Sequence, residues 1–327
     1  MNRERFIRSR RDDWQQFEVL LARLRSTSDT SWTGQQIADL SRLYRSICYD
    51  LSLVQSREWG ARLEAYLNDL VAQGHNCLYR SPPASAARAL EFLIYGFPQL
   101  LRSRRTEFAV SAALFAVPLF VSIMIAMIRP DLAATVVGDE AVSNVLDMYS
   151  GDSFGATVNQ QAGQRTYMFG FYVRNNTSLA FNAYVSGIFA GIGTCLILLS
   201  NGISIGMLTG TVLAAGSPTS VNYTSFIVTH GAPELTAIVI SGAAGLVLAG
   251  GIFIPGSRSR MASLRHHGRQ SLLLALGAGA MLFIAALLEG YFSARPIHPG
   301  FKYAAGAAAW LLVGLWLGLA GRGRASS

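Results

Sequence analysis

Charge is scarce in this sequence. Only 14% of its 327 residues are charged, whereas about a quarter of the residues carry a charge in a typical soluble domain. Hydrophobic residues make up 51% of the chain, and the mean hydropathy is +0.33. This composition excludes an ordinary soluble domain and predicts an all-α, polytopic membrane protein.

Cysteine and histidine are also scarce, with three and five residues. Cys48, Cys77 and Cys195 lack the close pairing of a zinc site, and the first two fall in a segment predicted to be cytoplasmic. His230 and Glu234 follow the pattern HxxxE rather than the HExxH of zinc hydrolases, and no serine or cysteine has an evident base. We therefore expect no disulfide, no metal, no cofactor and no enzymatic activity.

The charge that is present is concentrated near the N-terminus. Residues 1–107 contain 16 of the 26 arginines and 12 of the 19 acidic residues. The first eleven residues are rich in arginine and no apolar run follows them, so we expect no signal peptide. Apolar residues at helical spacing predict three amphipathic helices that pack together. Residues 1–107 are therefore predicted to form a cytoplasmic helical domain.

A fourth segment, residues 84–105, completes this domain. It carries apolar residues on one side and ends in Arg102, Arg104 and Arg105, next to the first long apolar run. This arrangement favours an interfacial helix that lies on the inner leaflet, with its arginines at anionic headgroups. Packing of the segment against the three-helix bundle is the alternative.

Residues 108–327 are predicted to form a membrane domain of about six helices. An apolar run of about 20 residues is long enough to cross the hydrocarbon core. The third predicted segment is short, and the fourth is long and contains Gly231 and Pro233, so we expect both to be re-entrant or broken. The predicted segments are 108–128, 179–199, 203–215, 226–254, 272–289 and 304–320.

The arginines also predict the orientation. Groups of arginines precede the first segment, separate the fourth from the fifth, and follow the last. Six crossings place all three groups in the cytoplasm, as the positive-inside rule requires. We therefore expect a multi-pass protein of the bacterial inner membrane, with both termini in the cytoplasm and residues 129–176 outside. The same arrangement accounts for the net charge of +8, which gives no reason to expect a nucleic-acid partner.

Glycines recur at a spacing of four in the membrane domain. This spacing lets helix backbones approach closely. It does not distinguish packing within one chain from packing in a homo-oligomer. The glycines predicted to form helix contacts are Gly187, Gly191, Gly202, Gly206, Gly210 and Gly245.

An intramembrane polar pocket is predicted around His230 and Glu234, which share a helix face at a spacing of four. Pro233 frees a backbone carbonyl in the same turn, and Asn201 and Thr236 are expected to join the pocket. A structural hydrogen-bonded network, a pathway for protons, ions or lipid, and an intramembrane hydrolase all remain open as interpretations.

Several short motifs resemble the stage II sporulation protein M family of bacterial integral membrane proteins. In the N-terminal part they include the runs 43–45 and 75–80, and in the membrane part the runs 187–194, 201–202 and 230–235. Residues that match the family pattern are Asn175, Asn176, Gly193, Thr194, Gly202 and Gly231. The resemblance implies a membrane scaffold without enzymatic activity of its own. In spore formers the namesake of the family acts with peptidoglycan-degrading partners, whereas this longer, arginine-rich chain is similar to relatives in bacteria that form no spores.

The sequence and the resemblance together lead to two functional expectations. The first is a non-enzymatic inner-membrane scaffold of an envelope-associated complex, with membrane lipid and membrane or envelope proteins as partners. The second is a transporter, channel or lipid-moving protein that uses the pocket of His230 and Glu234. Replacement of Glu234 by glutamine distinguishes them, because only a conducting protein needs the carboxyl group for flux.

Overall fold

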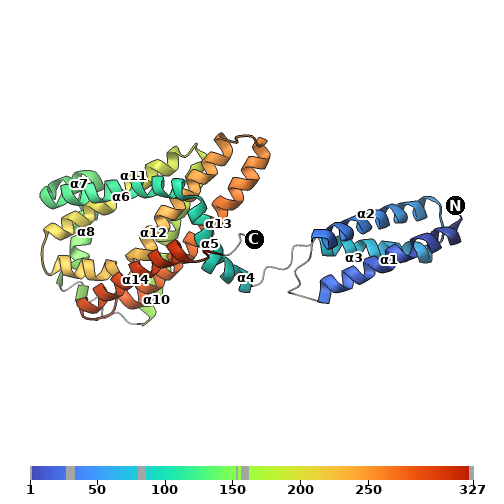
Figure 1. The fold of residues 1–327 in the computed structure, drawn as a ribbon. Helices are drawn as coiled ribbons and strands as arrows, with labels where there is room; N and C mark the ends of the chain where they lie inside the picture. Colours follow the sequence, from blue (N-terminus) through green and yellow to red (C-terminus); the bar gives the residue numbers. More distant parts are fainter. Residues whose placement is uncertain (1, 27–33, 80–85, 152–153, 156–161, 324–327) are drawn as a thin grey trace. The chain divides into compact units, whose positions relative to one another are not determined.

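The computed structural model describes residues 2–26, 34–79, 86–151, 154–155 and 162–323. Every regular element within these ranges is a helix, which confirms the all-α prediction. The contacts divide the chain into two compact units, Met1–Ser85 and Ala86–Ser327 (Figure 1). We call them the N-terminal unit and the membrane unit.

The N-terminal unit is a bundle of three helices, α1 (Arg3–Ser26), α2 (Gly34–Ser56) and α3 (Ala61–Tyr79). The apolar residues recur every three or four positions, so each helix presents one apolar stripe to the other two. The three helices meet in a single core cluster, as the periodicity predicted. Its buried members are Phe6, Trp14, Phe17, Leu21, Leu40, Leu43, Ile47, Val54, Leu63, Leu67 and Leu70.

One charged side chain is buried between α1 and α2. Asp50 is 2% exposed, and its carboxylate accepts hydrogen bonds from Nε of Arg10, at 2.9 and 3.1 Å, and from Nε1 of Trp14 at 2.9 Å. Arg10 also contacts Asp13 and Ser46. The buried carboxylate is therefore fully supplied with donors.

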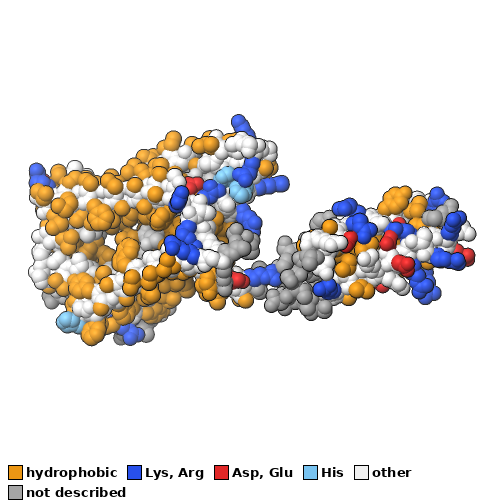
Figure 2. Space-filling model, viewed as in Figure 1, with side chains coloured by type: hydrophobic (Ala, Val, Ile, Leu, Met, Phe, Trp, Pro, Cys, Tyr) orange, Lys and Arg blue, Asp and Glu red, His pale blue; other side chains and the backbone are white. Residues whose placement is uncertain are grey.

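Among its described residues, the membrane unit contains five helices long and apolar enough to cross a bilayer. Figure 2 shows hydrophobic side chains over much of its visible face. Both findings fit a multi-pass membrane protein. The five candidate spans are α6 (Arg105–Ile128), α11 (Ile192–Ala214), α12 (Thr219–Phe253), α13 (Arg260–Leu288) with the π-helix η3 (Glu289–Ser293), and α14 (Pro299–Leu319).

The other helices of the membrane unit are shorter or less apolar. A short segment precedes α6, two helices follow it, and a 24-residue helix precedes α11. These elements are α4 (Ala86–Glu91), the π-helix η1 (Phe92–Gly96), α5 (Phe97–Ser103), α7 (Asp131–Val137), α8 (Asp139–Tyr149), α10 (Ala162–Val185) and the 3₁₀ turn η2 (Ser186–Ile188).

The predicted second and third segments are wrong. The run 179–199 is not one helix, because α10 ends at Val185 and a turn precedes α11. Gly191 takes the left-handed conformation in this turn, with φ of +78°, which a residue with a Cβ rarely adopts. The predicted short segment 203–215 is the second half of α11, a single helix of 23 residues that also contains Asn201. The residues predicted to lie outside, 129–176, include the first half of α10.

The predicted break in the fourth segment is also wrong. α12 runs without interruption through Gly231 and Pro233 for 35 residues, or about 52 Å at 1.5 Å per residue. It contacts α6, α10, α11, α13 and α14, and in Figure 1 it runs through the middle of the membrane unit. A proline inside a helix is tolerated when neighbouring elements enclose it, and Pro233 is buried.

The boundary between the units lies at Ser85 rather than at residue 107. α5 packs against α13 and α14 of its own unit, and Phe97 is fully buried in that contact. The predicted interfacial helix thus belongs structurally to the membrane unit.

Close backbone contacts join α11 to α6. A Cβ added to Gly206 would lie 2.5 Å from the carbonyl oxygen of Leu119, and one added to Gly210 would lie 2.5 Å from that of Ile123. Gly202 meets the carbonyl of Phe115 in the same way. The three glycines line one face of α11 at a spacing of four, so these contacts form within the chain.

The remaining predicted packing glycines lie where α10, η2 and α12 meet. A Cβ added to Gly187 would clash with the carbonyl oxygen of Gly245, and one added to Gly245 would clash with the hydroxyl of Thr194. A Cβ at Gly191 would be in ordinary contact with Ala249. Of these three glycines, Gly187 and Gly245 leave no room for a Cβ, whereas Gly191 does.

Candidate functional site

A buried group of polar side chains lies in the membrane unit where α12 meets η3. α12 carries Thr229, His230 and Glu234, and η3 begins with Glu289 and ends with Ser293. His230 and Glu234 are one helical turn apart, so both side chains lie on the same face of α12. We call His230, Glu234 and Glu289 the polar cluster.

The three members of the polar cluster approach one another closely. Nε2 of His230 lies 3.6 Å from Oε2 of Glu234. One ligand-type atom from each of the three side chains lies within 4.8 Å of the other two. His230 is 4% exposed and Glu289 is 8% exposed, so water has little access to either.

Hydroxyl groups orient the imidazole from its other side. Nδ1 of His230 lies 3.0 Å from Oγ of Ser293, and Thr229 contacts the same hydroxyl. The Thr229 hydroxyl donates to the carbonyl of Phe226 at 2.9 Å, and the Ser293 hydroxyl is 3.1 Å from the carbonyl of Leu288. Because both hydroxyls have an oxygen to donate to, Ser293 is free to accept a hydrogen bond from Nδ1–H.

Asn176 of α10 completes the surroundings of Glu289. The two side chains are hydrogen-bonded, and Oδ1 of Asn176 accepts from Nδ2 of Asn175 at 3.1 Å. Asn176 is 8% exposed. One oxygen of Glu289, Oε2, is buried without a hydrogen-bond partner among the described residues.

The only lysine of the sequence, Lys302, is buried near this site at the start of α14. Its Nζ donates to the backbone carbonyl of Ser293 at 2.7 Å and lies 5.8 Å from the ring centre of Phe154. The ammonium group is therefore bonded to the backbone of η3. The sequence analysis left this lysine between the predicted segments 272–289 and 304–320.

Aromatic residues cover the polar cluster. The ring of Phe226 meets the imidazole of His230 edge to face, with 5.4 Å between centroids. Tyr149, at the end of α8, packs against Phe226 and Tyr223, and its carbonyl accepts a hydrogen bond from Asn222. The end of α8 is thus attached to α12 one to two turns before His230.

Two of the residues predicted to form the pocket do not join it. Asn201 is half-buried on α11, and the contacts resolved for the polar cluster do not include it. Thr236 follows Glu234 by two residues, which turns it about 200° around α12 and away from the cluster. His230, Pro233 and Glu234 lie together in one turn of α12, as predicted.

Sequence reasoning missed Glu289, Asn176, Ser293 and Lys302 as parts of this site. Glu289 stands out in the sequence as a rare acidic residue in an apolar run, but nothing local links it to His230. The amide that hydrogen-bonds the cluster comes from the Asn175–Asn176 pair of the family pattern rather than from Asn201. The other pattern residues lie elsewhere; Thr194, for example, donates to the carbonyl of Ala183 at 2.7 Å.

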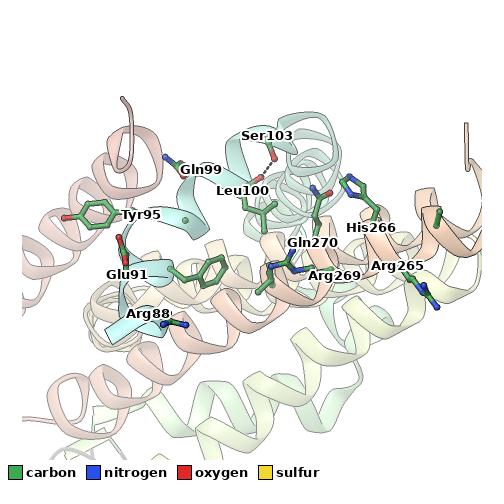
Figure 3. Close-up of a pocket in the computed structure, with 14 residues that line it drawn as sticks. Arg88, Glu91, Tyr95, Gln99, Leu100, Ser103, Arg265, His266, Arg269 and Gln270 are labelled. Atoms are coloured by element: carbon green, nitrogen blue, oxygen red, sulfur yellow. Dashed lines mark hydrogen bonds between the residues drawn. The ribbon is translucent and has the colours of Figure 1, made fainter. Parts of the chain in front are cut away.

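A second candidate site is a pocket of about 1000 Å³ between the α4–α5 segment and α13. We call it the basic pocket, because three arginines and a histidine line it against a single acidic residue. Figure 3 shows its side chains arriving from two sides, with Arg88, Glu91, Tyr95 and Gln99 on the α4–α5 segment and Arg265, His266, Arg269 and Gln270 on α13.

Two of the arginines predicted to face headgroups are bonded inside the protein instead. Arg102 donates to the carbonyls of Leu317 and Ala320, at 2.5 and 2.6 Å. Arg104 donates to Gln270 and pairs with Glu107 at 3.2 Å. The guanidinium groups join the junction of α5 and α6 to the end of α14 and to α13. Arg105 is exposed.

Comparison with known families agrees with the resemblance found in the sequence. The family described as stage II sporulation protein M matches residues 110–294, which include the whole polar cluster. A domain of unknown function, DUF8413, matches residues 4–80, the N-terminal unit. Neither a curated protein nor a solved structure matches the chain. Because the first match covers more than half of the sequence, the chain belongs to the stage II sporulation protein M family.

Proposed function

We propose that the protein is a non-enzymatic scaffold in the bacterial inner membrane. In this proposal the membrane unit anchors a separately folded N-terminal unit in the cytoplasm and presents α7 and α8 on the outside. Both surfaces dock proteins of an envelope-associated complex. The observation that carries the proposal is the division of the chain into two units with separate cores.

The N-terminal unit supports this role because its own residues form its apolar core and pair its buried carboxylate. Its apolar stripes are used in one core cluster, and its buried carboxylate, Asp50, is paired with Arg10 and Trp14. The unit has a complete core of its own. In this proposal its outer surface docks a protein partner.

The packing of the membrane unit favours an anchor over a conduit. The buried hydroxyls of Ser111, Thr194 and Ser271 donate to backbone carbonyls at 2.6 to 2.7 Å. In the half of α12 that follows Glu234, Ile240 and Ala244 are fully buried. A pathway for ions needs polar groups or water along its length, and this half offers tight apolar packing.

The contacts of Arg102 and Arg104 support the proposed orientation. They bring the start of α6, the first turns of α13 and the end of α14 to one end of the membrane unit. The three groups of arginines in the sequence therefore lie at the same end. In this proposal α10 crosses the bilayer together with the five candidate spans, which gives six crossings. The positive-inside rule then assigns this end, with both termini, to the cytoplasm.

Lipid is the second proposed partner. The basic pocket lies at this arginine-rich end, and guanidinium groups bind phosphate well because their planar donors match its oxygens. We propose that Arg265 and Arg269 contact anionic phospholipid headgroups there. The glycine contacts form within the chain, so a homo-oligomer would have to use other surfaces.

The test of the scaffold is isolation of the full-length protein with its native lipid, followed by mass spectrometry of the bound proteins. A scaffold should carry a protein partner in fixed stoichiometry, and Glu234→Gln should keep it. Absence of a stoichiometric partner from the native protein would contradict the proposal.

Conduction is the second candidate function, and the polar cluster is the observation that favours it. Intramembrane carboxylates and histidines commonly line proton and ion pathways. Purified protein in liposomes distinguishes the two functions. A scaffold should give no more proton or cation flux than protein-free liposomes, whereas a conducting protein should give flux that Glu234→Gln abolishes and Glu140→Gln does not.

A further inference from the structure

We propose that His230, Glu234 and Glu289 bind one divalent cation of the first transition row, with Zn²⁺ as the representative ion. The site would join α12 to η3 inside the membrane unit. The inference is independent of the scaffold role, because a bound ion can stabilise an anchor or a conduit equally.

The hydrogen bonds around His230 favour the tautomer with its proton on Nδ1. In that tautomer Nδ1–H donates to Ser293, whose own hydroxyl has oxygen acceptors at Thr229 and Leu288. A neutral imidazole carries one N–H, so Nε2 presents a lone pair. That lone pair faces Oε2 of Glu234 at 3.6 Å. Two acceptors that face each other in a buried site need a cation or a proton between them.

The opposite tautomer does not remove this need. It would place Nε2–H toward Glu234, but 3.6 Å exceeds the usual length of an N–H···O hydrogen bond. It would also leave Oε2 of Glu289 without a hydrogen-bond partner among the described residues.

The second argument is the carboxylate of Glu289. Its Oε2 is buried and has no hydrogen-bond partner among the described residues, although Asn176 hydrogen-bonds the side chain. A buried acceptor without a donor is costly, and more so when it is charged. This atom belongs to the same group of side chains whose ligand atoms lie within 4.8 Å of one another.

The total charge of the polar cluster also favours a divalent cation. Two ionised carboxylates and a neutral imidazole carry a charge of −2, which a divalent cation neutralises. Neutrality matters at this depth because isolated charges are costly in a medium of low dielectric constant. The nearby ammonium of Lys302 donates to the carbonyl of Ser293 rather than to a carboxylate, so it does not occupy the position between the acceptors.

The donor set indicates the class of ion. Imidazole nitrogen combined with carboxylate oxygen suits Zn²⁺ and its neighbours, whereas Ca²⁺ and Mg²⁺ prefer oxygen ligands in larger number. Three protein ligands leave a position for water, as in many zinc sites. Metal-binding histidines usually donate their second N–H to a nearby oxygen, and ligating carboxylates are themselves hydrogen-bonded. Ser293 and Asn176 occupy these two supporting positions.

The experiment measures metal binding to the full-length protein in detergent after treatment with a chelator. Zn²⁺ is titrated in by calorimetry, and the bound metal is counted by elemental analysis after dialysis. We expect one Zn²⁺ per chain, and binding at least tenfold weaker in Glu289→Gln and in Glu234→Gln. Glu140→Gln should bind as the native protein does, and Ca²⁺ should not compete at equal concentration.

Ser293→Ala provides a gentler variant, because it removes the oxygen that orients His230 and keeps all three ligands. Binding about 10–100-fold weaker is expected. Co²⁺ offers a readout that needs no variant, since its visible spectrum changes when an imidazole enters the coordination sphere. Absence of Zn²⁺ binding by the native protein would overturn the proposal, and so would native-like affinity in well-folded Glu289→Gln and Glu234→Gln.

Discussion

In the N-terminal unit the buried carboxylate of Asp50 accepts hydrogen bonds from Arg10 and Trp14, whereas in the membrane unit the carboxylates of Glu234 and Glu289 share a buried space with a ring nitrogen of His230. Donors surround the first carboxylate. Among the described residues, the other two carboxylates face other acceptors, and Asn176 hydrogen-bonds only the Glu289 side chain. The two units belong to one chain and are both all-helical, so the difference lies in the local chemistry of each site.

This difference distinguishes a structural network from a binding site. A buried group whose partners are all present stabilises a fold and requires nothing further. A buried group of acceptors is incomplete when an oxygen such as Oε2 of Glu289 has lost contact with water and has no donor among the described residues. The polar cluster is therefore the place in this molecule where a small cation is most strongly implied, and the predictions below test the contrast with Asp50.

The largest effect is expected from a variant that breaks the complete network around Asp50. Asp50→Asn leaves the guanidinium of Arg10 without its buried charge partner, which typically costs about 3–5 kcal/mol. Hydrogen exchange of peptides from α1 and α2, measured in the full-length protein, should become much faster. Asp39→Asn is the control, because its pair with Arg42 is exposed and contributes at most about 1 kcal/mol. Equal exchange in the two variants would show that the Asp50 network is unimportant.

The next effect tests whether the membrane unit is tightly packed outside the polar cluster. Gly206→Ala would place a methyl group against the carbonyl of Leu119, and overpacking of this kind costs about 1–3 kcal/mol. Gly314→Ala meets nothing within 4 Å and should be neutral or slightly stabilising. Thermal unfolding in detergent measures both. A lower melting temperature for the Gly314 variant than for the Gly206 variant would contradict the observed contact between α6 and α11.

A smaller effect of unusual sign is expected at Glu289. Asp50→Asn should destabilise the N-terminal unit, but Glu289→Gln brings an amide donor into a group of acceptors. In the presence of a chelator it should therefore be neutral or stabilising by up to about 1 kcal/mol.

Added Zn²⁺ should make the native protein more stable than Glu289→Gln. The native protein should gain about 2.7 kcal/mol at a free concentration of 100 times the Kd, and Glu289→Gln should gain much less. Thermal unfolding with and without the metal checks both statements. A large loss of stability in chelator-treated Glu289→Gln would mean that the polar cluster is already complete.

The smallest effect concerns pH and the N-terminal unit. Burial, together with a hydrogen bond to Glu18, raises the pKa of Tyr66 to about 12 from the model-compound value of 10.0. The unfolded chain loses this proton first as the pH rises, so the unit should lose stability between pH 10 and 12. Tyr66→Phe should remove that part of the pH dependence. Identical slopes of stability against pH in the native protein and the variant would refute the assignment.

Much of the fold follows from short-range patterns in the sequence. The three amphipathic helices of the N-terminal unit, and the apolar helices α6, α13 and α14, were predictable because helical periodicity and hydropathy act within one segment. The break between α10 and α11 was not. The run 179–199 is mostly apolar. The turn appears only in the structure, where Ala190 and Gly191 have positive φ and Gly187 packs against Gly245.

The candidate site was half predictable for the same reason. His230 and Glu234 are four residues apart, so helix geometry alone places them together. Glu289 and Asn176 come from other helices, and their approach depends on how α10, α12 and η3 pack. Asn201 was expected in the pocket because it is a polar residue in an apolar region. The neighbouring glycines pack α11 against α6, and this packing fixes the position of Asn201.

X-ray absorption at the zinc edge of the metal-loaded, full-length protein tests the central claim most directly. The account predicts nitrogen and oxygen ligands at about 2.0–2.2 Å, with the outer-shell signal of one imidazole, and loss of this signal in Glu289→Gln. A spectrum of fully hydrated zinc would contradict it, and so would sulfur ligands at about 2.3 Å, because the ion would then be bound away from the polar cluster.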